Sequence, residues 1–159
     1  MSLGNRRNGR EYALKVLYSL YDQDRPIQEV LADFWRNFRF NDDVLGEPEE
    51  MQDSEVLPEV KEFAEQIVLG VYEHLEDIDA VLRETSKNWS LDRMARLDLS
   101  LMRLACYELM YMPSTPDRVV INEAIEIAKR YGTKDTSAFL NGVLDKIAQQ
   151  VKARRQEEA

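Results

Sequence analysis

Residues 118–152 constrain the fold most, because their apolar positions recur with the spacing of two consecutive α-helices. Gly132 separates the two helices, and a glycine at this place can take the left-handed conformation that ends many helices. The second helix can be capped by Thr133, Asp135 or Thr136. One face of the first helix carries Ile121, Ala124, Ile125 and Ala128, and the stripe of the second is Phe139, Leu140, Val143, Leu144, Ile147 and Val151.

The same helical spacing recurs along the whole chain, and no segment shows the alternation typical of a strand. We therefore expect an all-α fold of about seven helices, with a disordered start before residue 5. An acidic loop at 41–58 should divide the single domain, 1–159, into helical subdomains at about 5–40 and 59–152. The expected helices are 8–22, 27–38, 59–74, 76–87, 96–111, 118–131 and 135–151, with a short turn at 90–94.

Composition excludes several classes of protein. The chain has 159 residues with one cysteine and one histidine, which excludes an internal disulfide, a Cys-rich zinc site and any site that needs two histidines. No apolar run approaches the ~20 residues of a membrane helix, and the N-terminus lacks the apolar centre of a signal peptide. We expect a cytoplasmic protein without a membrane contact, a metal or another cofactor.

Charge is distributed unevenly along the chain. The net charge is −9, and residues 42–62 hold nine acidic residues and one lysine. By contrast, residues 5–15 carry four basic residues against one acidic residue, and residues 129–155 carry seven against two. An acidic body with basic ends is typical of a protein that binds polyanions at one place.

The first helix places its arginines next to its apolar stripe. Arg10 and Arg6 lie on the same helical face as that stripe, one turn and two turns before it. An arginine cannot occupy a core without a partner. We therefore expect Arg6, Arg7 and Arg10 to be exposed together, with Tyr18 half packed at the flank of the stripe. These residues could form an edge for single-stranded RNA or only a solvated chain end, and the pattern alone leaves both open.

The candidates for catalysis are weak. His74 lacks the Glu-x-x-His spacing of a di-iron bundle, because Val71 stands three residues before it, so we expect a structural or surface histidine. Cys106 lies within an apolar helix and is expected to be a buried small hydrophobe. The acidic residues are spread over polar faces, where solvated charge is the default. We expect no enzyme.

Four segments of the sequence resemble the NusB family of bacterial transcription antitermination factors. Residues 121–132, Ile-Asn-Glu-Ala-Ile-Glu-Ile-Ala-Lys-Arg-Tyr-Gly, followed by Phe-Leu-Asn-Gly-Val-Leu-Asp-Lys at 139–146, look like the C-terminal signature of that family. Three further segments stand in the order of the family: residues 6–18, 71–74 and 101–109. The resemblance covers nearly the whole chain except residues 36–58.

The resemblance implies a function and the residues that carry it. In the family the arginine-rich N-terminus binds the boxA element of ribosomal RNA transcripts, which points here to Arg6, Arg7, Arg10 and Tyr18. Phe139 would lie on the RNA-facing surface by resemblance, although the pattern alone favours a core residue, and Lys146 could widen the basic patch. Asp98 matches a position that faces NusE, a small-subunit ribosomal protein.

The implied complex is an RNA-binding adaptor that pairs with NusE, other Nus factors and RNA polymerase and opposes termination. One departure stands in the N-terminal motif: Asn8 and Gly9 replace a frequent Arg-Ala pair, which removes a charge and loosens the helix start. RNA binding is therefore expected to be weaker or more dependent on the partner.

Two other hypotheses remain. The chain could be the NusB-like portion of a ribosomal RNA cytosine methyltransferase, but such an enzyme needs a cofactor-binding α/β domain after the helices, and this chain ends at Ala159. It could also be a homodimer that hides its basic face.

Overall fold

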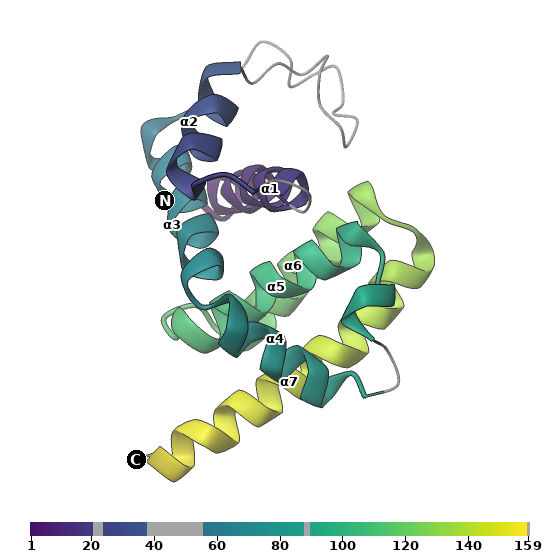
Figure 1. Cartoon of the computed structure of the whole chain (residues 1–159). Helices are drawn as coiled ribbons and strands as arrows, with labels where there is room; N and C mark the ends of the chain where they lie inside the picture. The colour runs from purple at the N-terminus through teal and green to yellow at the C-terminus, as the bar shows by residue number, and fades with distance from the viewer. Residues whose placement is uncertain (21–23, 38–55, 88–89, 159) are drawn as a thin grey trace. The chain divides into compact units, whose positions relative to one another are not determined.

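The protein is all-α over the residues that the structure describes, which confirms the predicted fold class. The computed structural model describes residues 1–20, 24–37, 56–87 and 90–158 (Figure 1). Every regular element within these ranges is helical, and the predicted turn at 90–94 is the 3-10 helix η3 (Leu91–Arg93). The described residues fall into two compact units, Met1–Tyr72 and Glu73–Ala159.

The first unit contains α1 (Leu3–Leu20), α2 (Ile27–Asn37) and most of α3 (Pro58–Glu73). α2 packs against α1 through an edge-to-face pair, with the ring centroids of Tyr12 and Trp35 5.6 Å apart. Pro58 opens α3, where the missing N–H of a proline costs nothing. Of the predicted acidic loop at 41–58, residues 41–55 lie outside the residues that the structure describes. α3 belongs with α1 and α2 in this unit, whereas it was predicted to belong with the later helices.

Gly9 brings α1 and α3 close together. A Cβ built on Gly9 would lie 2.6 Å from Cδ2 of Phe63 and 3.4 Å from the carbonyl oxygen of Val60, both in α3. The glycine that weakens helix propensity at the start of α1 therefore provides the space in which the ring of Phe63 packs. This close approach explains a glycine that, in the sequence alone, indicates only a loosened helix start.

The second unit contains the remaining helices. α6 packs on α7, α5 contacts both of them, and α4 contacts α5 and α7. Its core is made of aliphatic side chains on the inward faces of four helices, and these include Leu82, Leu99, Met102, Ile127, Leu140 and Ile147. The helices are α4 (Leu75–Thr85), α5 (Arg96–Tyr111), α6 (Asp117–Tyr131) and α7 (Lys134–Glu158).

The junction between α6 and α7 differs in part from the sequence prediction. Gly132 ends α6 with φ −112° and ψ −166°, so the predicted left-handed conformation is wrong. A Cβ at Gly132 would lie 3.0 Å from the Ala128 carbonyl oxygen and from Thr136, and this crowding favours glycine. The predicted threonine cap is confirmed: the Thr136 N–H donates to Oγ1 of Thr133 at 3.3 Å, and the Thr133 N–H donates to Oγ1 of Thr136 at 3.2 Å.

Most of the predicted apolar stripes are buried. The stripe of α7 is buried apart from the half-buried Phe139, but on α6 the positions Ile121 and Ile125 are only half-buried while Val120 and Ile127 are enclosed.

Two helix ends were predicted wrongly, because α1 starts at Leu3 rather than at 8 and α7 runs to Glu158 rather than 151. Polar residues at these ends carry no apolar period that could reveal a helix.

A paired carboxylate joins α4 to α5. Asp79 accepts two hydrogen bonds from Arg103, at 2.9 Å from Nε and 3.0 Å from Nη2, in the two-pronged geometry that a guanidinium prefers. The side chains of Asp79 and Arg103 are only 12% and 22% exposed. The expectation of solvated carboxylates is therefore wrong at Asp79, which faces a cation on a neighbouring helix.

The residues considered for catalysis have structural surroundings. His74 stacks on Tyr111 with ring centroids 4.0 Å apart, and Cys106 is fully buried. Burial raises the pKa of the Cys106 thiol to about 12, as expected for a small core residue that stays protonated. Within the described ranges no helix is long and apolar enough to cross a lipid bilayer.

The close approach at Gly9 gives a prediction with a matched control. Gly9→Ala gains about 1 kcal/mol of helix propensity but crowds the ring of Phe63, which costs about 1–3 kcal/mol. We expect a net loss of about 1 kcal/mol in the free energy of unfolding, measured by urea denaturation. Gly142→Ala, in the middle of α7 where a Cβ would have no neighbour within 4 Å, should instead gain up to about 1 kcal/mol. Equal gains at both positions would contradict the close approach at Gly9.

A second prediction concerns Cys106 and alkaline pH. Because the folded pKa of about 12 lies above the ordinary thiol value of 9.0, the unfolded chain loses its thiol proton first. The contribution of the buried Cys106 thiol to the free energy of unfolding is complete below about pH 9 and is lost as the pH rises toward 12. Unfolding measured from pH 8 to 11 should show a steeper loss of stability for the wild type than for Cys106→Ala. Parallel curves would show that the thiol ionises equally in both states.

Candidate nucleic-acid interface

The N-terminal end of α1 presents two of the predicted arginines. α1 already includes residues 6 and 7, and the Asn5 N–H donates to Oγ of Ser2 at 3.1 Å at the helix start. Arg6 is exposed and forms no ion pair within the described part of the chain, while Arg7 is half-buried. Both arginines are therefore held on a helix.

Arg10 does not share this exposure, so the prediction that it is exposed is wrong. Its side chain is 1% exposed, and its guanidinium carbon lies 5.6 Å from the centroid of the Phe63 ring. An arginine over an aromatic face is stabilised by the ring quadrupole, so Phe63 gives this cation a place inside the first unit. Arg10 is positioned to hold α1 on α3.

Tyr18 lies at the other end of α1. It is half-buried, as the sequence predicts, and eleven residues of helix place it about 16 Å from Arg7 along the axis. The residues between them, from Gly9 to Leu17, are all buried, including Lys15, whose ammonium lies 5.4 Å from the centroid of the Tyr12 ring. α1 therefore exposes side chains at its two ends and not along a continuous strip.

The other two predicted RNA-binding residues lie together in the second unit. Phe139 and Lys146 are on α7 and line a groove of about 830 Å³ whose opposite wall is the C-terminal end of α4. Phe139 is half-buried, which lies between its core and surface interpretations, and Lys146 is exposed as predicted. The α7 wall consists of Ala138, Phe139, Gly142, Val143, Lys146 and Gln150, and the α4 wall of Glu84, Thr85, Ser86 and Lys87.

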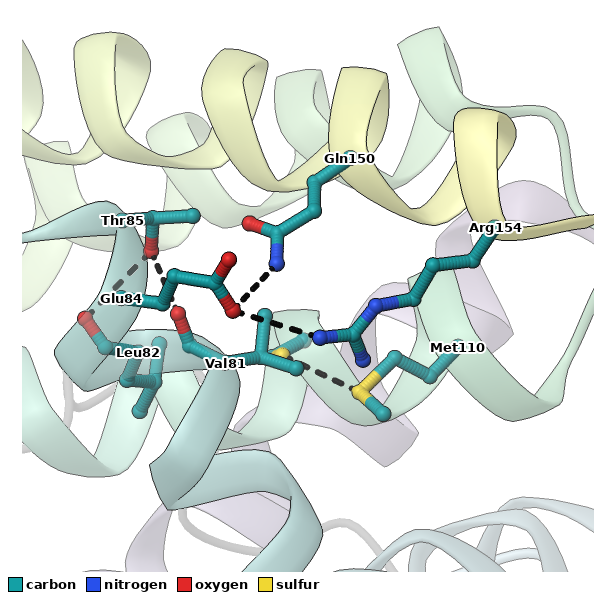
Figure 2. Close-up of polar contacts among 8 residues, drawn as sticks. Val81, Leu82, Glu84, Thr85, Met110, Gln150 and Arg154 are labelled. Carbon is teal, nitrogen blue, oxygen red and sulfur yellow. Dashed lines mark hydrogen bonds and ion pairs between the residues drawn. The ribbon is translucent and has the colours of Figure 1, made fainter.

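A polar bridge crosses one end of this groove. Gln150 Nε2 donates to Oε2 of Glu84 at 2.7 Å, and Arg154 Nη2 reaches the same oxygen at 3.3 Å (Figure 2). The side chains of Glu84 and Arg154 are 56% and 48% exposed, so solvent screens this ion pair and it adds little to stability. Its effect is to hold the Glu84 carboxylate in one orientation.

Asp98 stands in the first turn of α5, as the sequence predicts. Burial raises the pKa of its carboxyl above the usual range, and a hydrogen bond with the Thr136 side chain acts in the opposite direction. Asp98 is half-buried and hydrogen-bonded, so it departs from the solvated charge expected by default for the acidic residues. The hydrogen bond links Asp98 to α7 only three residues before Phe139.

The groove residues that the sequence did not reveal include Glu84, Lys87 and Gln150. One signal was present, since positions 139, 142, 143, 146 and 150 share a face of α7 by helical spacing. The α4 residues gave no such signal, because nothing in the sequence shows that the end of α4 lies opposite that face.

Comparisons with known proteins cover almost the whole chain. The NusB family model matches residues 7–149. The transcription antitermination protein NusB of Syntrophotalea carbinolica is 54% identical over 148 residues, which is 93% of this chain and 94% of that protein. The corresponding protein of Trichlorobacter lovleyi is 47% identical and covers 91% of each chain.

Solved structures agree in fold. The structure of T. maritima NusB superposes with a TM-score of 0.72 at 34% identity, over 91% of this chain and 90% of that one. A crystal structure of antitermination factors NusB and NusE in complex with double-stranded RNA superposes with a TM-score of 0.73 at 21% identity, over 94% of this chain and 99% of that one. Because sequence identity and fold agree across both described units, the chain belongs to the NusB family.

Proposed function

We propose that this chain is a transcription antitermination factor, an RNA-binding adaptor that binds boxA RNA together with NusE and acts without catalysis of its own. The observation that carries the proposal is the pair Arg6 and Arg7 on the first turns of α1, within a chain of the NusB family. Such an adaptor works on nascent transcripts, which places it in the cytoplasm. There, with other Nus factors, it would help RNA polymerase to resist termination.

The chemistry of α1 suits single-stranded RNA. Guanidiniums make two-pronged contacts with phosphate oxygens, and the half-buried ring of Tyr18 offers a face on which a base can stack. The two groups are about 16 Å apart, a span that a few nucleotides can bridge. Arg10 supports this site from within by holding α1 on α3, and it does not contact the RNA itself.

Asp98 supports the proposed contact with NusE. The half-buried carboxylate lies in the first turn of α5, where it could accept a hydrogen bond from a cationic partner. The family relative described as a complex with NusE and RNA makes such a pairing the natural one to test. The contact between Asp98 and Thr136 further suggests that NusE binding affects the start of α7, next to Phe139.

The arginine pair yields a direct test of RNA binding. Arg6→Ala with Arg7→Ala should lower the affinity for boxA RNA about tenfold, because each charge-assisted phosphate contact contributes about 1 kcal/mol or more. The slope of log affinity against log salt should fall in magnitude by about 0.7 for each phosphate that the variant no longer binds. Fluorescence anisotropy over a salt series measures both quantities.

Arg36→Ala with Arg118→Ala is the matched control, because it removes two exposed cations from α2 and α6. The control should change affinity less than twofold. Equal losses in the two double variants would show that only net charge matters and would remove the α1 end from the site.

Asp98 yields a test of the partner surface. Asp98→Asn keeps an acceptor for Thr136 but loses the charge, so it should weaken NusE binding severalfold and leave boxA binding by the isolated chain unchanged. Asp98→Lys removes both, so we expect a larger loss of NusE binding together with a small loss of RNA binding. Titration calorimetry against each partner measures these changes, with Asp117→Lys in the first turn of α6 as control. Unchanged NusE binding in both Asp98 variants would place the partner elsewhere.

A further inference from the structure

We propose that the groove between α4 and α7 is a nucleotide subsite in which Glu84 selects a base that carries an exocyclic amino group. The inference rests on the proposed RNA-binding function and adds a specificity-determining residue to it. It follows from a groove that is lined by both cationic side chains and hydrogen-bond acceptors.

The two lysines of the groove suit a phosphate. Lys87 and Lys146 line the groove from opposite walls, and neither forms an ion pair within the residues that the structure describes. Two unneutralised lysines that face one groove attract an anion, and an RNA backbone supplies anions at regular spacing. The half-buried Phe139 on the same wall offers an apolar ring beside these cations, the combination on which single-stranded nucleic acid commonly binds.

The α4 wall of the groove also presents hydrogen-bond acceptors. The Thr85 hydroxyl donates to the Val81 carbonyl oxygen at 2.8 Å, and the Ser86 hydroxyl donates to the Leu82 carbonyl oxygen, so both have only lone pairs left for a ligand. Oε2 of Glu84 is engaged by Gln150 and Arg154 (Figure 2). Oε1 of Glu84 has no hydrogen-bond partner among the described residues, so it is available to accept from a ligand.

This arrangement distinguishes the bases by whether they present a hydrogen-bond donor or an acceptor to Glu84. Cytosine, adenine and guanine present amino groups that donate to a carboxylate, whereas the corresponding position of uracil is a carbonyl oxygen that a carboxylate repels. Gln150 and Arg154 hold the carboxylate in place, so little ordering is needed when a base binds. Arg154 also offsets the charge of Glu84, which lessens its repulsion of the phosphates. The groove volume of about 830 Å³ is ample for one nucleotide.

The test compares cytidine and uridine hexamers by fluorescence anisotropy at fixed salt. The wild type should bind the cytidine hexamer about five- to tenfold more tightly. Glu84→Gln should reduce the preference to within twofold, because an amide can both donate and accept. Glu126→Gln, an exposed glutamate that pairs with Lys129 on α6, makes the same charge change outside the groove and should keep the preference. Thermal unfolding confirms that each variant is folded.

A local readout makes the result independent of the α1 site. The side-chain amide resonances of Gln150 should shift on titration with cytidine 5′-monophosphate and much less with uridine 5′-monophosphate. An unchanged preference in Glu84→Gln, or equal shifts with the two nucleotides, would overturn the inference. Failure of the proposed function looks different: no hexamer would bind, and the nucleotide titration would still decide whether the groove selects a base.

Discussion

The two-pronged hydrogen bond between Asp79 and Arg103 fixes α4 on α5, and the arrangement of the second unit depends on it. A buried carboxylate without its cation would be severely destabilising, so each side chain requires the other in one geometry. Since α4 also packs on α7, this pair helps to determine which residues face one another across the groove. Glu84 lies five residues after Asp79 on the same helix, so its position relative to Gln150 follows from the packing that the pair holds in register.

Burial limits which cations of the protein can meet RNA. Four basic residues lie within the first fifteen positions, yet Arg10 and Lys15 are enclosed with aromatic rings, Arg7 is half-buried and only Arg6 of the four is exposed. In the second unit Arg155 donates to the Leu109 carbonyl oxygen at 2.7 Å, at the C-terminal end of α5 where a cation is favoured by the helix dipole. The available positive charge is therefore smaller and more localised than a count of residues indicates.

Much of the fold was predictable, because core burial imposes a helical period on apolar residues. The bounds of α5 agree with the prediction, and α6 differs from it by one residue. The prediction failed where polar residues continue a helix, as at both ends of the chain, and where a single position has two roles. Gly9 is the clearest case: its poor propensity was visible, but the ring of Phe63 that requires its small size comes from a helix about fifty residues later in the chain.

The sequence by itself determined the helical class, the family and the residue types that could bind RNA, since period, motif and charge are local properties of the chain. Only the tertiary structure decided that Arg10 is enclosed, that Asp98 contacts Thr136 and that Lys87 and Glu84 lie opposite Phe139 and Lys146. The physical reason is that burial and pairing depend on which helix faces supply the neighbours. Those neighbours are distant in sequence, and no local pattern specifies them.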